Sequence, residues 1–169
     1  NSTDSIAQGE AFQDSLAGSW DGFVAKFDRL GTFVWDTYLG GPLDDNVVAC
    51  EAFNNGSVHA LGTTSSTSFL EDNDLNVPQP HGGGTDAFVL QFNISGEAER
   101  GMYFGGSGNE TAVGLEINAT PEIFVAINTD GSTGLASSDA ANTSPFGNSD
   151  GVIFSMDTTY NVWWSSYFG

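Results

Sequence analysis

Two stretches of this 169-residue chain are close copies of each other. Residues 21–41 read DGFVAKFDRLGTFVWDTYLGG and residues 86–106 read DAFVLQFNISGEAERGMYFGG, and a third copy starts at residue 150 with DGVIFSMDTTYNVWWSSYFG. The aspartates that open the copies are 65 and then 64 residues apart, and a tyrosine recurs at the same intervals. A fixed period of this length indicates an array of similar supersecondary modules.

The period divides the chain into three segments. We expect a first repeat over residues 1–65, a second over 66–130 and a partial third over 131–169. Each full repeat should hold a linker and four strands, and the partial repeat a linker and two strands. The incomplete unit is therefore expected at the C-terminal end of the chain.

Short runs of β-branched and aromatic residues bounded by turn residues predict ten strands and no helix. In the turns at 28–31 and 93–96, Asp or Asn comes first and glycine supplies a left-handed position. The turn at 157–160 has Tyr160 in place of that glycine, so we expect it to be built differently. The predicted strands are 22–28, 32–39, 46–53, 57–63, 87–93, 97–104, 111–118, 122–128, 151–157 and 161–168.

Several predicted strands, such as 87–90 and 123–127, are apolar at both parities, which indicates cover on both faces. Four-stranded units that cannot bury both faces alone are typical of β-propeller blades or solenoid turns. The predicted fold class is all-β: four-stranded antiparallel propeller-type blades in about two and a half repeats of about 65 residues. Such an array cannot close a ring, so we expect it to be open or completed by neighbouring chains.

Three motifs carry a resemblance to a known family. They are Gly-Gly-Gly-Thr-Asp-Ala-Phe-Val at 82–89, Tyr-Leu-Gly-Gly at 38–41 with two aspartates after it, and Leu-Gly-Thr-Thr-Ser-Ser at 61–66. With these motifs, almost the whole chain resembles the bacterial seven-bladed β-propeller repeat family of large secreted or surface proteins. The resemblance implies a blade used as a scaffold, with no catalytic residues to carry over. Leu70, where such repeats often have proline, departs from the pattern.

Charge excludes several classes of partner. Three Lys and Arg against 22 Asp and Glu give a net charge of −19, which repels phosphate backbones and anionic lipids. We therefore expect no nucleic-acid partner, and the lack of a run of about 18 apolar residues predicts no membrane insertion. The only cysteine, Cys50, follows an apolar run, so we expect a buried and inert thiol.

The pattern Asn-X-Ser/Thr occurs six times, against about 2.5 expected by chance from 13 Asn and 32 Ser or Thr in the chain. All six asparagines fall in predicted turns, loops or the terminus, where a modifying enzyme can reach them. The excess predicts an extracellular protein with covalently attached N-glycans, although these residue types also gather in turns for conformational reasons. The candidates are Asn1, Asn55, Asn93, Asn109, Asn118 and Asn142.

Two acidic clusters are candidate Ca²⁺ sites, since this ion takes six to eight oxygen ligands. Neither cluster matches the EF-hand loop, and solvated loop charge is the alternative interpretation, so no cofactor is required. The aspartates that open the repeats are expected to cap turns. The acidic clusters comprise Asp44 and Asp45 in one loop, and Glu71, Asp72 and Asp74 in another.

Trp35 and Trp164 are candidate ligand or interface residues. They occupy matching repeat positions, and the second repeat has Arg100 there, so this position tolerates charge and is expected near the outer edge. An exposed tryptophan at that edge could stack on a sugar or meet another subunit.

No catalytic constellation is evident, because His59 and His81 have no nucleophilic Ser or Cys nearby in the sequence. We therefore expect a protein that is not an enzyme. The leading hypothesis is an extracellular structural glycoprotein that self-assembles into a filament or surface layer, or belongs to a larger surface protein. Its partners would be further copies of itself or the remaining blades of a longer chain. The alternatives are a carbohydrate-binding, lectin-like propeller module and a fragment of a secreted hydrolase.

Overall fold

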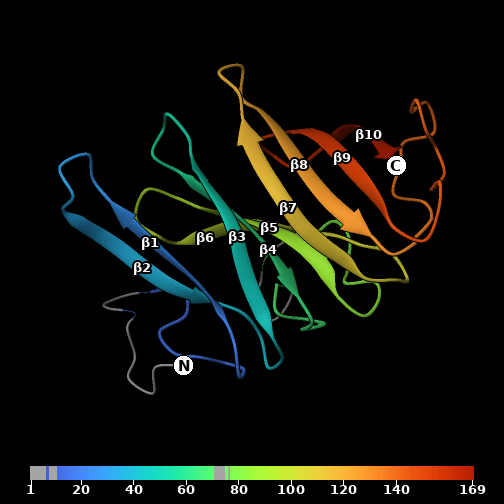
Figure 1. The fold of residues 1–169 in the computed structure, drawn as a ribbon. Helices are drawn as coiled ribbons and strands as arrows, with labels where there is room; N and C mark the ends of the chain where they lie inside the picture. The colour runs from blue at the N-terminus through green and yellow to red at the C-terminus, as the bar shows by residue number, and fades with distance from the viewer. Residues whose placement is uncertain (1–6, 8–10, 71–74, 76) are drawn as a thin grey trace.

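A computed structural model describes residues 7, 11–70, 75 and 77–169. The fold is all-β: the described residues form ten strands in antiparallel sheets of two, four and four strands, with no helix among them (Figure 1). In chain order the strands are β1 (Gly22–Phe27), β2 (Phe33–Leu39), β3 (Asp45–Ala52), β4 (Val58–Thr64), β5 (Asp86–Phe92), β6 (Ala98–Phe104), β7 (Glu110–Ile117), β8 (Glu122–Thr129), β9 (Asp150–Asp157) and β10 (Val162–Phe168).

Each predicted strand is present, and each predicted end lies within one residue of the observed end. The prediction succeeds because every strand is a β-branched or aromatic run that stops at a turn residue. The β3–β4 hairpin, for example, closes around Asn55 and Gly56, and Gly56 has a φ of 85° that favours glycine. The all-β class and the antiparallel pairing are therefore confirmed.

The sheets combine strands from neighbouring repeats. One sheet has the order β3-β4-β5-β6, so it joins the last two strands of the first repeat to the first two of the second. The other has the order β10-β9-β8-β7, and β1 pairs with β2 alone. The sheets are therefore out of phase with the predicted repeats: the two-stranded sheet lies at the N-terminal end, whereas the partial repeat is predicted at residues 131–169. A sequence period gives the length of a module but not where the module starts.

The three sheets pack face to face in chain order, with β7 crossing over β3, β4 and β5 (Figure 1). One hydrophobic core lies between the β1–β2 hairpin and the β3–β6 sheet, and a second lies between the two four-stranded sheets. Only the middle sheet is therefore covered on both faces. The first core includes Trp35, Leu39, Phe88, Leu90 and Phe92, and the second includes Val89, Phe104, Val125, Phe154 and Tyr167.

The third hairpin turn is built like the other two. The backbone amides of Gly31, Gly96 and Tyr160 each donate to the carbonyl of the first turn residue, at 3.0, 3.2 and 3.0 Å. Their φ angles are 81°, 90° and 66°, so the expectation of a different third turn is wrong. A left-handed tyrosine costs about 1–3 kcal/mol. Burial of its ring and a 3.0 Å hydrogen bond between its hydroxyl and Nδ1 of His59 offset this strain.

The aspartates that open the repeats cap the preceding loops, as the sequence predicts. Asp21, Asp86 and Asp150 each accept a hydrogen bond from a backbone amide three or four residues earlier, at 2.6–3.2 Å. The glycine that follows each outer strand touches the same carboxylate. A Cβ added at Gly40 would lie 2.8 Å from the Asp21 carboxylate, and one at Gly105 only 2.1 Å from that of Asp86. The repeated glycine is therefore required by close packing.

Matching phenylalanines in two repeats should differ sharply in their contribution to stability. Phe92 is 0% exposed, and Phe27, 65 residues earlier, is 57% exposed. We expect Phe92→Ala to lower the free energy of unfolding by about 3–5 kcal/mol, because it leaves a cavity in the core. Phe27→Ala should cost less than about 1 kcal/mol. Urea unfolding in dilute solution measures both changes, and equal losses would contradict the one-sided cover of the end sheets.

Candidate functional sites and open sheet faces

Among the described residues, no other sheet covers one face of the β7–β10 sheet. Strand register places Trp164 and Phe124 on this face on either side of Ser155, with their ring centroids 6.4 Å apart and Phe168 further along β10. Trp164 and Phe168 are both exposed, whereas Phe104, which matches Phe168 in the second repeat, is buried under the next sheet. The exposure of this face therefore comes from the lack of a neighbouring sheet among the described residues.

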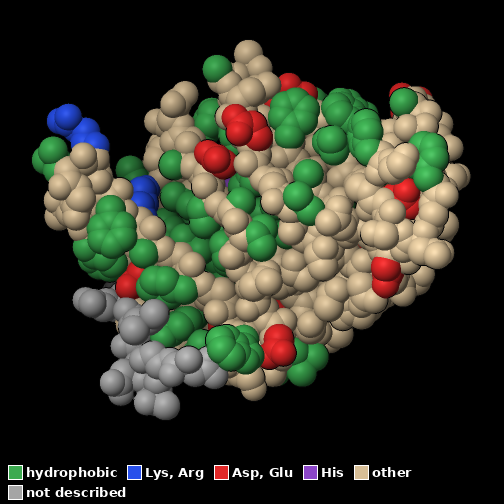
Figure 2. Space-filling model, in the orientation of Figure 1, with side chains coloured by type: hydrophobic (Ala, Val, Ile, Leu, Met, Phe, Trp, Pro, Cys, Tyr) green, Lys and Arg blue, Asp and Glu red, His purple; other side chains and the backbone are tan. Residues whose placement is uncertain are grey.

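The β1–β2 hairpin is only partly covered by described residues on its opposite side, where Tyr38 is buried beside Phe23. Phe23, Phe27 and Phe33 are exposed there, while Phe88 and Phe92, which match the first two, are fully buried in the middle sheet. Figure 2 shows hydrophobic side chains gathered over this hairpin, with Lys and Arg side chains beside them. The two ends of the stack thus present different apolar faces: one contains Trp164, and the other contains exposed phenylalanines.

The β1 strand is also an open edge. It pairs only with β2 among the described residues, whereas its counterparts β5 and β9 pair with a strand on each side. A free edge presents unpaired backbone N–H and C=O groups, which can template another strand. The free edge of β1 and the exposed face of the hairpin together make this end of the molecule suited to binding another β-strand or sheet.

The hairpin leaves part of the middle sheet bare as well. Cys50 on β3 is exposed, which contradicts the expected burial, whereas the matching Leu115 on β7 is buried under the middle sheet. The difference arises because the two-stranded sheet does not extend over β3 as a four-stranded sheet does over its neighbour. Desolvation of the sulfur and the Glu51 charge nevertheless raise the pKa of Cys50 to about 11, so the thiol stays protonated at neutral pH.

Trp35 is an internal contact residue. It is 7% exposed, its Nε1 donates to the Ile94 carbonyl at 3.1 Å, and its ring centroid lies 5.3 Å from that of Phe92. The expectation of an exposed edge tryptophan is therefore wrong for Trp35 and correct for Trp164, which is 39% exposed. The two differ because a neighbouring sheet covers Trp35 and none of the described residues covers Trp164 in the same way.

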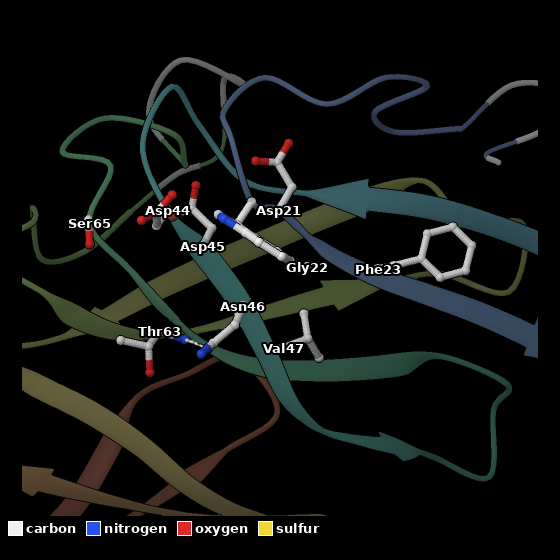
Figure 3. Close-up of a pocket in the computed structure, with 10 residues that line it drawn as sticks. Asp21, Gly22, Phe23, Asp44, Asp45, Asn46, Val47, Thr63 and Ser65 are labelled. Atoms are coloured by element: carbon white, nitrogen blue, oxygen red, sulfur yellow. Dashed lines mark hydrogen bonds between the residues drawn. The ribbon is translucent and has the colours of Figure 1, made fainter. Parts of the chain in front are cut away.

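A pocket of about 560 Å³ lies where β1 and β3 begin (Figure 3). Its lining includes the exposed Trp20 together with Asp21, Asp44 and Asp45. Figure 3 shows the three carboxylates at one end of the pocket, while Asn46 lies further along β3. An aromatic face beside acidic and amide groups can bind a polar ligand with apolar patches, such as a sugar.

The sequence offers Trp20 only as one of four tryptophans that could stack on a sugar, and the repeat does not single it out. The matching position in the second copy is Thr85, so Trp20 falls outside the shared pattern. A position that departs from an otherwise regular repeat is the signal that could have found it.

Asp45, one of the candidate calcium ligands, connects the loop after β2 to the loop after β4. Its carboxylate accepts from the Gly41 amide at 2.7 Å and from the Ser66 hydroxyl at 3.0 Å. Burial raises the pKa of Asp45, and the charge of Asp21 raises it further. Glu110, the matching residue on β7, is also buried and accepts from a glycine amide at 2.8 Å. The acid at this position is therefore a repeated structural feature.

Within the described ranges, no group of three or more His, Cys, Asp and Glu side chains is arranged to hold a metal ion. Asp44 is exposed beside Asp45 at the start of β3. The second acidic cluster, with Glu71, Asp72 and Asp74, lies outside the described residues. Of the candidate calcium ligands, the structure thus describes only Asp44 and Asp45, which are adjacent in the sequence at the start of β3.

Five of the six candidate glycosylation sites are described, and all five lie in turns, in loops or at a strand start. Among them only the Asn55 side-chain amide donates no hydrogen bond, so it is the one most open to modification. Asn1 lies outside the described residues. The others donate through Nδ2: Asn93 to Glu97 at 2.6 Å, Asn109 to Asp130 at 2.6 Å, Asn118 to Glu122 at 2.9 Å and Asn142 to the Tyr167 carbonyl at 3.1 Å.

A polar cluster interrupts the core between the two four-stranded sheets. Desolvation, with a smaller effect from Arg100, lowers the pKa of His59 to about 4, so the ring is neutral where it meets Tyr160. Burial raises the pKa of Tyr160. A cavity of about 320 Å³ beside them is lined by Glu99, Arg100 and Asn161, among others. The cluster joins the sheets through neutral hydrogen bonding.

No protein-family model matches this chain, and no curated protein is significantly similar to it. In the part of the chain that the structure describes, no helix has the length and apolar character needed to cross a membrane. Function is therefore argued from the geometry of the open faces, the pocket and the surface asparagines.

Replacing His59 should remove part of the pH dependence of stability. Its folded-state pKa of about 4 lies below the unfolded value of 6.5, so the unfolded chain binds the proton more readily. Its contribution to stability is present above pH 6.5 and is lost as the pH falls toward 4. Wild type should lose up to about 3 kcal/mol that His59→Gln does not lose. Urea unfolding at several pH values measures this, and parallel profiles would contradict it. Tyr160→Phe, which keeps the histidine, is the control.

Proposed function

We propose that this chain is a non-enzymatic, extracellular structural glycoprotein built from propeller-type blades. It self-assembles into a filament or surface layer, or forms part of a larger surface protein. The observation that carries the proposal is the pair of open apolar faces, one on the β1–β2 hairpin and one on the β7–β10 sheet. Isolated soluble proteins rarely expose such faces, which mark sites of association.

The strand order supports propeller-type blades. Both four-stranded sheets are antiparallel meanders whose strands follow in chain order, and each packs its face on the next sheet. Meanders stacked in this way are the building units of propellers, which bury each blade between two neighbours. The middle sheet has this environment on both sides.

The surface supports an extracellular glycoprotein. Asn55 is exposed in a tight turn, with its side-chain nitrogen free of hydrogen bonds among the described residues. A net charge of −19 with three Lys and Arg suits an exterior where cations or neutral sugars separate the carboxylates. Glycans on turn residues would lie at sheet ends and leave the stacking faces clear.

Protein secreted by its natural host should form discrete assemblies larger than one chain and carry glycans. Negative-stain imaging at high protein concentration checks the first point, and intact mass before and after deglycosylation checks the second. Peptide mapping should find Asn55 modified, because its amide is the most accessible. Single particles with the mass of the bare polypeptide would contradict the whole proposal.

A carbohydrate-binding module is the second candidate function, and the Trp20 pocket is the observation that favours it. The pocket combines an exposed indole with Asp44 and Asn46, which offer oxygen and amide groups to sugar hydroxyls. The pocket lies beside β1 and β3, away from the open face of β7–β10, and it shares Phe23 with the open face of the hairpin.

If the pocket binds sugars, Trp20→Ala should abolish binding on a glycan array, because the stacking surface is lost. Trp163→Ala, which removes another exposed indole far along the chain, should leave that binding unchanged. Absence of wild-type binding to every glycan, or equal loss in both variants, would remove this candidate.

A further inference from the structure

The contact made by Trp35 within the chain shows how one sheet recognises the next. Trp35 lies over the turn between β5 and β6, where its Nε1 donates to the Ile94 carbonyl at 3.1 Å. A Cβ added at Gly96 would come within 2.8 Å of the Trp35 ring. Trp35 therefore needs a neighbouring turn that has no side chain at its left-handed position.

Trp164 occupies the matching position on the last sheet. Strand register puts it on the open face, where its ring centroid lies 6.4 Å from that of Phe124. Its indole N–H has no hydrogen-bond partner among the described residues. Trp35 has a glycine turn to rest on inside the chain. Trp164 offers the same tryptophan surface, but no described turn covers it.

The other half of this contact lies on the β1–β2 hairpin. Gly31 matches Gly96, has a φ of 81°, and would have no described atom of another segment within 4 Å of an added Cβ. Arg29 matches Ile94, and the exposed Phe27 matches Phe92, which packs against Trp35. The hairpin therefore presents the kind of surface on which Trp35 rests, and no described residue covers its Gly31 turn.

The contact between the two four-stranded sheets indicates that the residue at the tryptophan position of one sheet must fit the residue at the glycine position of the turn that it meets. There Arg100 takes the position of the tryptophan, Tyr160 takes the position of the glycine, and both line one cavity. The Tyr160 ring is buried and lies against that of His59. In each internal contact the aromatic ring thus comes from one side only, so Trp164 fits a glycine turn such as that of Gly31.

We propose that the open face of β7–β10 binds a second copy of this chain, whose β1–β2 hairpin docks there with its Gly31 turn on Trp164. The inference rests on the proposed scaffold function and adds its partner and its contact residues. Lys26 is turned toward the middle sheet, where its Nζ donates to the Gly56 carbonyl, so Arg29 in the turn is the hairpin cation that can face residues 110–169, which contain seven Asp or Glu and no Lys or Arg. The contact joins two different faces, so it is head to tail.

Sedimentation velocity of the full chain over a wide concentration range tests the Trp164 side. Trp164→Ala should weaken self-association by about tenfold or more, as expected for a central tryptophan in an interface. Trp163→Ala is the matched control, because this neighbouring exposed residue sits at the register shift of β10. It should leave association within about twofold of wild type.

The hairpin side has its own variant. Gly31→Asn should weaken association comparably, because asparagine tolerates a left-handed backbone but puts a side chain where the indole must rest. Gly134→Asn is the control, since Gly134 also has a positive φ, at 83°, and open space around it. Unfolding curves of all four variants check that each chain is folded.

Mixing the two weakened variants gives the sharpest test of the head-to-tail arrangement. Trp164→Ala keeps an intact hairpin, and Gly31→Asn keeps an intact β7–β10 face, so the mixture should form one-to-one dimers and nothing larger. A mixture that stays monomeric would overturn the proposal, as would a Trp164→Ala chain that associates like wild type.

These results separate the contact from the scaffold function. If the wild-type chain associates and the Trp164→Ala and Gly31→Asn variants associate equally well, this contact is wrong and the proposed scaffold function is unaffected. A wild-type chain that stays monomeric throughout also overturns the contact, and imaging of the natural assemblies then decides the scaffold function by itself.

Discussion

The described sheets carry apolar side chains on both faces, so a sheet buries all of them only when it has a neighbour on each side. The middle sheet has two neighbours, and Phe92 on one face and Phe104 on the other are buried. The end sheets have one each, and Phe27 and Phe168 remain exposed. Burial of one such side chain is worth about 1.5–3 kcal/mol, so the open faces favour association strongly. The open faces are therefore the feature on which the proposed assembly rests.

The loops that connect one sheet to the next are held by buried acidic side chains packed against glycines. Asp86 caps its loop and touches Gly105, and Glu110 accepts from a glycine amide at the start of β7. Burial raises the pKa of Asp86, and the charge of Glu110 adds to this rise. A raised folded-state pKa means that this acid lowers stability as the pH rises, whereas His59 lowers it as the pH falls. The two kinds of buried group therefore oppose each other across the pH range.

The sequence predicts the strands well because turn residues and β-branched runs are local signals. It does not show which strands share a sheet, because strand pairing such as that of β4 with β5 joins segments across a long linker. Tyr160, Trp35 and Cys50 were misjudged for a related reason: each depends on a neighbouring sheet. His59 stabilises Tyr160 in a turn made for glycine, the next sheet buries Trp35, and the short hairpin leaves Cys50 bare. Local pattern carries no information on such neighbours.

A head-to-tail contact does not saturate itself, because each bound copy buries one face and presents another. The rotation between successive copies then decides between a closed ring and an open filament. Long-range repulsion between chains of net charge −19 opposes both, so association has to come from close apolar contact and not from steering. The Trp–Gly pairing suits that demand, since a ring over a bare turn buries apolar area, and the carboxylate of this turn, Asp28, already accepts hydrogen bonds from the backbone amides of Leu30 and Thr32.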